Sequence, residues 1–236
     1  MFMALKSYLK FIWKAKNDDK CKAFSACKKF GEFFNMNKKQ LEIKLSSLKS
    51  FVLRKIELEQ YQSSSELASF ILLKALFNND IKGKVVADLA CGNGIYGIGA
   101  LLFGAKKVYF LDVDSDVLSI CKENVKSLKL SSKAVFINSD VSSFDKKVDT
   151  VLMNPPFGVH KRKADKDFLL RAFNCAKAVY SLHKIESKSF ISEISAENGF
   201  LVSEIFPIKM SVKKSYSFHT KKEVSVDIGL WILRKG

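Results

Sequence analysis

The chain has few of the residues that mark fibrous, secreted or membrane-spanning proteins. Its 236 residues include 11 glycines and 3 prolines, too few for a collagen-like or low-complexity sequence. The five cysteines are odd in number and form no close pairs, which argues against a disulfide framework and favours a reducing compartment. The cysteines and histidines nowhere have the spacing of zinc ligands, so no metal is expected. No window approaches 18 uncharged apolar residues and no signal-peptide core is present, so neither membrane insertion nor secretion is expected.

The charge balance is strongly positive. Forty Lys and Arg side chains face 24 Asp and Glu side chains, which leaves a net charge of +16. Half of this excess lies in residues 1–60, which hold 14 basic and 6 acidic side chains. Such a balance is expected of a protein that meets the phosphates of a nucleic acid, although a lysine-rich bias with solvated faces is the competing interpretation. Because 47% of the residues are hydrophobic, the chain can still bury a sizeable core.

Residues 1–40 differ in pattern from residues 41–236. Residues 1–16 alternate apolar side chains with lysines at helical spacing, which predicts a basic amphipathic helix. Such a helix can pack on the body of the protein, or lie on RNA or on a membrane surface, and the residues leave these alternatives open. We therefore expect a basic helical extension over residues 1–40 and a separate domain over residues 41–236.

From residue 41 onwards, helical patterns alternate with short apolar runs that are typical of strands. Alternation of this kind predicts a parallel sheet with helices on both faces. The last two extended runs have no helix between them, which predicts an antiparallel hairpin at one edge. Strands are expected at residues 85–89, 108–112, 134–138, 148–153, 179–182, 200–208 and 224–233, and helices at 41–56, 64–73, 96–103, 117–125, 168–177 and 191–197.

A glycine-rich motif, Asp88-Leu-Ala-Cys-Gly-Asn-Gly94, follows the first predicted strand and precedes a helix. In this context glycines let a ligand approach the backbone, and the helix N-terminus faces that ligand. Asp112 ends the second strand, where a carboxylate can accept both hydroxyls of a ribose. A nicotinamide cofactor is the competing ligand, but its fingerprint needs a third glycine, and Gly97 and Gly99 stand at the wrong offsets. Asp88 can orient the loop and face a cationic sulfonium ligand.

A second motif, Asn154-Pro155-Pro156-Phe157, follows the fourth predicted strand. Ligands of such sheets bind at the carboxyl ends of the strands, so this motif shares a crevice with the glycine-rich loop. The Asn154 side-chain oxygen and the Pro155 carbonyl can together accept both hydrogens of a planar NH2 group. Phe157 offers a flat face on which a flipped base can stack. The motif therefore predicts catalysis on an exocyclic amino group.

At these residues the chain resembles the adenine-N6 branch of the class I methyltransferases that use S-adenosylmethionine. More closely, it resembles the methyltransferase-like protein 5 family, which methylates adenosine in small-subunit ribosomal RNA. The resemblance covers residues 41–236 and implies a Rossmann-like, seven-stranded α/β sheet whose last strand is antiparallel. The segments that carry it are Leu58–Tyr61, Val85–Leu89, Met153–Gly158, Ala178–Lys184, Phe218-His219 and Lys221-Lys222.

The resemblance also implies residue roles. Asn154 to Phe157 would be catalytic, Asp112 would bind the ribose, and Asp140 and Val141 would contact the adenine ring. The remaining cofactor contacts implied by the family are Gln60, Ser63, Asp88, Ala90, Gly92, Asn93, Gly94 and Ile95.

Three positions of this group depart from the family pattern. Ala90 stands where the family usually has glycine, and its methyl group is tolerable only if the φ angle is negative. Asn93 stands where a cysteine is common, and Ser63 replaces a threonine but keeps the hydroxyl group.

The implied partners are ribosomal RNA and a small zinc-ribbon activator subunit, docked along an exposed strand edge. Phe136 and Ile137 are candidates for that edge, and equally for the core. The family implies an intracellular, cytoplasmic protein, with the nucleus as a second location if the source is eukaryotic.

Three alternative functions stay open. Protein-glutamine N5-methyltransferases use a similar motif, because a side-chain amide is also a planar NH2 group, but their aromatic residue is usually tyrosine. DNA adenine methylation is the nearest alternative among substrates. A non-catalytic RNA-binding module on a methyltransferase fold is the alternative that is not an enzyme, and the intact Asn154 and Asp112 argue against it.

Overall fold

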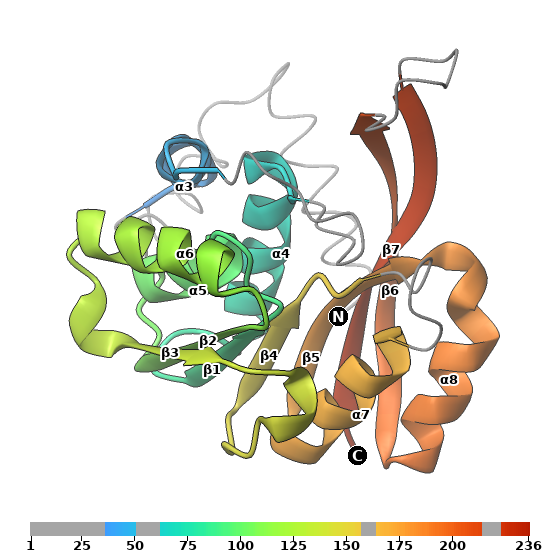
Figure 1. Cartoon of the computed structure of the whole chain (residues 1–236). Coiled ribbons are helices and arrows are strands. Elements are labelled where there is room, and N and C mark those ends of the chain that lie inside the picture. Colours follow the sequence, from blue (N-terminus) through green and yellow to red (C-terminus); the bar gives the residue numbers. More distant parts are fainter. Residues whose placement is uncertain (1–35, 51–61, 157–163, 214–222) are drawn as a thin grey trace, which may run out of the picture. The chain divides into compact units, whose positions relative to one another are not determined.

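A seven-stranded sheet organises residues 41–236 of the computed structural model (Figure 1). The structure describes residues 36–50, 62–156, 164–213 and 223–236, and the chain divides into two units at residues 40 and 41. The helical extension predicted for residues 1–40 lies almost wholly outside the described residues and stays a prediction. Gln60 and Phe157 of the predicted site also lie outside them.

The strands follow the order β3-β2-β1-β4-β5-β7-β6. The first five strands pair in parallel, and β7 is antiparallel to both β5 and β6. This topology confirms the predicted α/β fold with its antiparallel last strand. The strand bounds are β1 Val85–Leu89, β2 Lys107–Asp112, β3 Ala134–Asn138, β4 Thr150–Met153, β5 Ala178–Lys184, β6 Phe200–Lys213 and β7 Glu223–Lys235.

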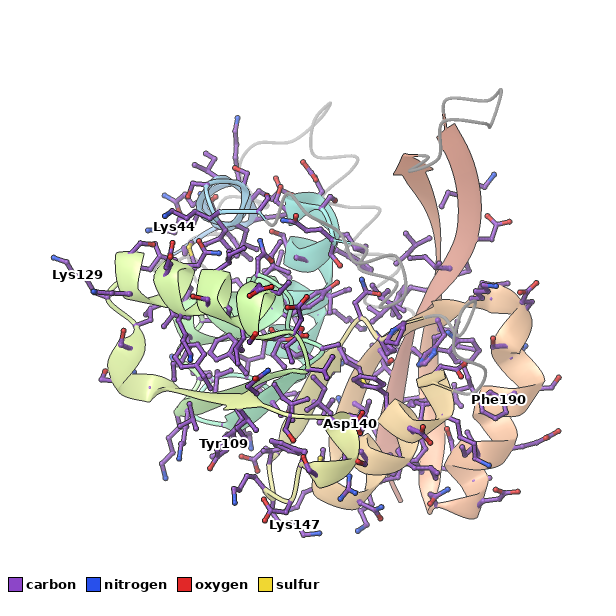
Figure 2. All side chains as sticks on the ribbon, in the orientation of Figure 1. Lys44, Tyr109, Lys129, Asp140, Lys147 and Phe190 are labelled. Carbon is purple, nitrogen blue, oxygen red and sulfur yellow. The ribbon has the colours of Figure 1, made fainter. Side chains whose placement is uncertain are left out.

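Helices cover both faces of the sheet. Within the described part of residues 41–236, α4, α5 and α6 lie on one face, and α7 and α8 lie on the other (Figure 1). Figure 2 shows two exposed lysines, Lys129 after α6 and Lys147 before β4, pointing outward, whereas Lys74 of α4 is buried and pairs with Glu204 at 2.9 Å. The helix bounds are α3 Lys38–Ser46, α4 Ser65–Phe77, α5 Ile95–Leu102, α6 Ser115–Ser127, α7 Ala164–Cys175 and α8 Lys188–Glu197.

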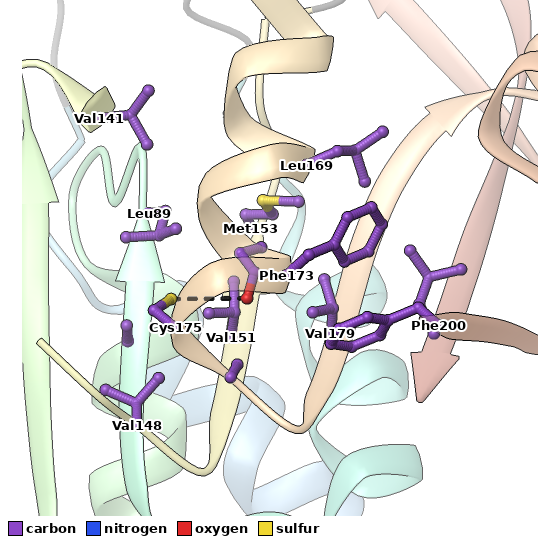
Figure 3. Close-up of a cluster of buried hydrophobic side chains, with 14 of the residues drawn as sticks. Leu89, Val141, Val148, Val151, Met153, Leu169, Phe173, Cys175, Val179 and Phe200 are labelled. Atoms are coloured by element: carbon purple, nitrogen blue, oxygen red, sulfur yellow. Dashed lines mark hydrogen bonds between the residues drawn. The ribbon is translucent and has the colours of Figure 1, made fainter. Parts of the chain in front are cut away.

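The core beneath α7 supports the end of β4 (Figure 3). Phe173 of α7 packs against Phe200 with the two rings tilted by 32° and their centroids 4.5 Å apart, and Val151 and Met153 of β4 are 0% and 2% exposed in the same cluster. Full burial of one such side chain stabilises the fold by roughly 1.5–3 kcal/mol. The chain therefore leaves β4 from a rigid base, directly before Asn154.

The helix predicted over residues 41–56 is wrong in part, because α3 ends at Ser46. The backbone of Lys49 bonds to a side chain instead of continuing the helix: its N–H donates to Asn124 Oδ1 at 2.8 Å, and its carbonyl accepts from Asn124 Nδ2 at 3.0 Å. Tertiary hydrogen bonds at this point override the local helical pattern. Residues 51–56 lie outside the described residues.

Candidate active site

The candidate site lies at the carboxyl ends of β1, β2 and β4. The strand order changes direction between β1 and β4: from β1 the next strand in sequence, β2, lies on one side, and from β4 the next strand, β5, lies on the other. Ligands of open α/β sheets bind in the crevice at this switch point. The fold brings the glycine-rich loop, Asp112 and Asn154 to this one edge, as their positions after strands predict.

Left-handed backbone conformations shape the loop between β1 and α5. Gly92 and Gly94 have φ angles of 55° and 87°. A Cβ atom on Gly94 would lie 2.5 Å from the Sγ of Cys121, so a side chain there meets both strain and a steric clash. Ala90 also has a positive φ, of 57°, which contradicts the negative φ that its methyl group was expected to require. The loop therefore carries backbone strain beside the site.

The carboxylate of Asp112 fastens this loop to the end of β2. Its Oδ2 accepts from Gly92 N at 2.9 Å and its Oδ1 accepts from Asp114 N at 3.0 Å. Burial raises the pKa of Asp112, while these two backbone donors act in the opposite direction. The residue thus holds the loop in place, and its contact with a ribose stays a prediction.

Asp88 is fully buried under the loop. Its Oδ2 accepts from Gly97 N at 2.7 Å in the first turn of α5, a position where the helix dipole favours an anion. Its Oδ1 has no hydrogen-bond partner among the described residues. Burial, and secondarily the nearby charge of Asp112, raises the pKa of Asp88 well above its usual value, and the Gly97 hydrogen bond only partly offsets this. A cationic ligand would satisfy the unpartnered oxygen and the charge, so the site fits a cofactor that carries ammonium and sulfonium groups.

Asn154 connects to two buried hydroxyl groups. Its Nδ2 donates to Ser63 Oγ at 3.2 Å, and Ser63 Oγ lies 2.7 Å from Tyr96 Oη. Of the two prolines that follow, Pro155 is buried and Pro156 is half-buried. Ser63 directly precedes the N-cap of α4, so the predicted cofactor residue Ser63 and the predicted catalytic residue Asn154 are in contact.

The other predicted cofactor residues surround this centre. Asn93 is 2% exposed, and its Nδ2 donates to the Lys49 carbonyl at 3.2 Å, so its side chain is committed to holding the loop. Ile95 is buried at the start of α5. Asp140 caps the short 3-10 helix Val141–Ser143 by accepting from Ser142 N at 2.9 Å, and the Val141 side chain lies in the core. The adenine contacts of these two residues stay predictions.

Sequence reasoning missed Tyr96 and Asn124. Asn124 joins three segments, because it binds both backbone groups of Lys49 and donates to the Asn93 carbonyl at 3.0 Å. A signal for it exists: Asn124 follows Val117 and Cys121 at positions i+7 and i+3 of one buried helix face, where an apolar residue is expected. Tyr96 carries no such signal, because a tyrosine on a buried helix face is ordinary.

This placement of loop, acid and Asn-Pro-Pro motif on a sheet with an antiparallel seventh strand is that of a class I methyltransferase. The model of the methyltransferase small domain family matches residues 62–185. The rRNA N(6)-adenosine-methyltransferase METTL5 of Danio rerio is 38% identical over 201 residues, which are 82% of this chain and 96% of that protein. The chain belongs to the methyltransferase small domain family and, within it, to the methyltransferase-like protein 5 family.

Two further relatives show how much of the chain is shared. The rRNA N(6)-adenosine-methyltransferase Mettl5 of Drosophila melanogaster is 34% identical, with 82% of this chain and 94% of that protein covered. Among solved structures, PH1948 from Pyrococcus horikoshii has a TM-score of 0.78 and 40% sequence identity over 85% of this chain and 98% of that one. The likeness therefore covers more than four fifths of this chain and nearly the full length of each relative.

Proposed function

We propose that this chain transfers the methyl group of S-adenosylmethionine to N6 of an adenosine in ribosomal RNA. The single observation that carries the proposal is the position of Asn154, which follows β4 at the switch point and is held there by Ser63. Family membership supports the substrate, because two relatives that match 82% of this chain are named as rRNA N(6)-adenosine-methyltransferases. The small ribosomal subunit is the finer assignment that the family resemblance suggests.

When bound, S-adenosylmethionine supplies an electrophilic methyl group. Asp88 would face its positive charge through the unpartnered Oδ1, and the backbone of Gly92 and Gly94 would lie along its methionine part. Asp112 would bind the ribose, and Asp140 and Val141 would contact the adenine ring. Gln60 and Ser63 would cover the cofactor, with Ala90, Asn93 and Ile95 completing the loop around it.

Asn154 and Pro155 act on the target amino group. The Nδ2 edge of the Asn154 amide faces Ser63, which turns its Oδ1 edge away from that hydroxyl. Oδ1 and the Pro155 carbonyl would accept the two N–H groups of adenine, and this leaves the nitrogen lone pair available for attack on the methyl carbon. Pro156 stiffens the turn, and Phe157 would stack on the flipped base.

A methyl-transfer assay tests the proposal and separates it from its alternatives. The protein is incubated with tritiated S-adenosylmethionine and, in parallel, with ribosomal RNA, duplex DNA and a peptide-release factor. We expect label in ribosomal RNA. Label confined to DNA would identify a DNA adenine methyltransferase, label in the release factor a glutamine N5-methyltransferase, and tight RNA binding without transfer a binding module.

A protein partner is a further part of the proposal. The resemblance suggests a small zinc-ribbon activator that pairs with an exposed strand edge, and β3 is an edge strand of the sheet. Phe136 and Ile137 are half-buried there, and the Phe136 ring stacks on Phe110 at 5.3 Å. Co-expression with such a subunit should raise the yield of soluble protein, and Phe136→Glu should abolish co-purification.

The location follows from the same assignment. No helix in the described residues is long and apolar enough to cross a membrane. Cys91, Cys121 and Cys175 are free thiols, which suits a reducing compartment. We place the protein in the cytoplasm, where ribosomal RNA is accessible in many cells, with the nucleus as the second location in a eukaryote.

A further inference from the structure

Three side chains from separate segments form a hydrogen-bonded chain that ends on Asn154. Asn154 Nδ2 lies 3.2 Å from Ser63 Oγ, and Ser63 Oγ lies 2.7 Å from Tyr96 Oη. Ser63 is 6% exposed and Tyr96 is 3% exposed, so water competes little for these hydroxyl groups. Burial also raises the pKa of Tyr96, which keeps the phenol protonated in any ordinary assay buffer.

An asparagine amide can occupy its place in two ways. A rotation of 180° exchanges the acceptor Oδ1 and the donor Nδ2 with almost no change in shape. Only one orientation serves the reaction, because the adenine amino group needs an acceptor. The reversed amide would present its own NH2 group to that amino group, so two donors would face each other.

The Ser63 hydroxyl discriminates between these orientations only if its proton is already engaged. Either hydroxyl can donate in this contact. When Ser63 donates to Tyr96 Oη, only the lone pairs of Ser63 Oγ remain for Asn154, and these accept a hydrogen from Nδ2 but none from Oδ1, which carries no hydrogen. This is the orientation that the structure shows. Without the phenol oxygen, Ser63 can donate its proton to Oδ1 and so stabilise the reversed, unproductive amide.

We infer that Tyr96 is a positioning residue, which acts through Ser63 to hold the Asn154 amide in its productive orientation. This inference rests on the proposed function, because it assumes that Asn154 Oδ1 accepts the target amino group. Tyr96, on α5, would thus affect the reaction without contacting either acceptor of the target amino group, Asn154 Oδ1 or the Pro155 carbonyl.

The test is Tyr96→Phe, which removes one oxygen atom and keeps the ring. The single-turnover rate of methyl transfer to ribosomal RNA, at saturating cofactor, should fall about three- to tenfold, the scale of one lost hydrogen bond. The dissociation constant for S-adenosylmethionine, measured by calorimetry, should stay within about twofold of wild type. A merely structural defect would lower the rate and would also raise this dissociation constant. Tyr109→Phe is the matched control, because Tyr109 lies half-buried on β2 away from Asn154, and its rate should not change.

Ser63 provides the second measurement. Ser63→Thr keeps the hydroxyl and should keep the wild-type rate, whereas Ser63→Ala should lose activity. Adding Tyr96→Phe to Ser63→Ala should cause no further loss, because the phenol would act only through the missing hydroxyl. Independent, multiplying losses would overturn the inference, as would a wild-type rate for Tyr96→Phe.

The outcomes separate this inference from the proposed function. If the wild-type protein does not methylate adenosine in ribosomal RNA, the proposed function fails. If the wild-type protein does so and Asn154→Ala is inactive, while Tyr96→Phe is as fast as wild type, only the role of Tyr96 fails.

Discussion

Replacing Ala90 with glycine should stabilise the protein, although the change removes a methyl group. Ala90 has a φ angle of 57°, in the left-handed region that costs a residue with a Cβ atom roughly 1–2 kcal/mol. Glycine avoids this cost but gains freedom in the unfolded chain, which offsets about 0.4–1 kcal/mol. The difference between the two ranges is roughly 0–1.6 kcal/mol, so the free energy of unfolding should rise by about 0.8 kcal/mol, which corresponds to roughly 2–3 °C in the melting temperature of a domain of this size.

Two matched glycine variants make this prediction specific. Lys129→Gly changes an exposed residue with a φ of 58° that lies outside the site, and its free energy of unfolding should rise by a similar amount. Ala134→Gly changes a residue at φ −108° on β3, where alanine is not strained. Its free energy of unfolding should fall by about 0.5–1 kcal/mol, because glycine only adds freedom to the unfolded chain. Urea denaturation of the cofactor-free protein measures all three variants. Loss of stability in Ala90→Gly equal to that in Ala134→Gly would refute the argument that residue 90 is strained.

Three further variants test the parts of the cofactor site. Asp112→Ala should weaken S-adenosylmethionine binding by about 2–3 kcal/mol through the loss of charge-assisted hydrogen bonds, and unchanged affinity in a folded variant would assign this carboxylate to the loop alone. Burial raises the pKa of Asp88 in the folded protein above its value of about 4 in the unfolded chain. The neutral side chain therefore contributes its full stability below the pKa of the unfolded chain, and this stability is lost as pH rises through the pKa of the folded protein. Asp88→Asn should therefore remove a decline in cofactor-free stability that sets in as pH rises above about 4, and parallel pH curves for the two proteins would contradict this. Asn124→Ala should lower the free energy of unfolding by about 1–3 kcal/mol and weaken cofactor binding, because it removes the bonds to Lys49 and Asn93. Lys49→Ala is the control: it keeps the backbone bonds of residue 49, loses only an exposed contact with Glu123, and should change stability by less than about 0.5 kcal/mol. Similar losses in both variants would exclude the proposed role of Asn124 in joining these segments.

Most of the sheet could be predicted because its strands are short apolar runs with clear boundaries. The runs at residues 85–89 and 134–138 coincide with β1 and β3. Boundaries set by tertiary contacts were missed. β4 begins at Thr150 rather than at residue 148, because Val148 N bonds to the Cys175 carbonyl, and the Asp149 side chain accepts from Val85 N.

The site was predictable where its residues follow strands within recognisable motifs. Asp88 is the last residue but one of β1, Asp112 ends β2 and Asn154 follows β4, so the topology alone brings them together. The positive φ of Ala90 and the contacts of Tyr96 depend on segments that meet only in the folded chain. A pattern along one sequence cannot express such contacts.

Methyl transfer by Asn154→Ala tests the central claim most directly. The variant removes the amide that would accept the target amino group, and it leaves Asp88, Asp112 and the glycine-rich loop intact. Ribosomal RNA is treated with each protein and S-adenosylmethionine, then digested to nucleosides for mass spectrometry, while calorimetry measures cofactor affinity. We predict N6-methyladenosine from the wild-type protein, none above background from Asn154→Ala, and cofactor affinities that agree within about threefold, or 0.7 kcal/mol. Transfer by Asn154→Ala within a few-fold of the wild-type rate would contradict the claim that this residue performs the reaction.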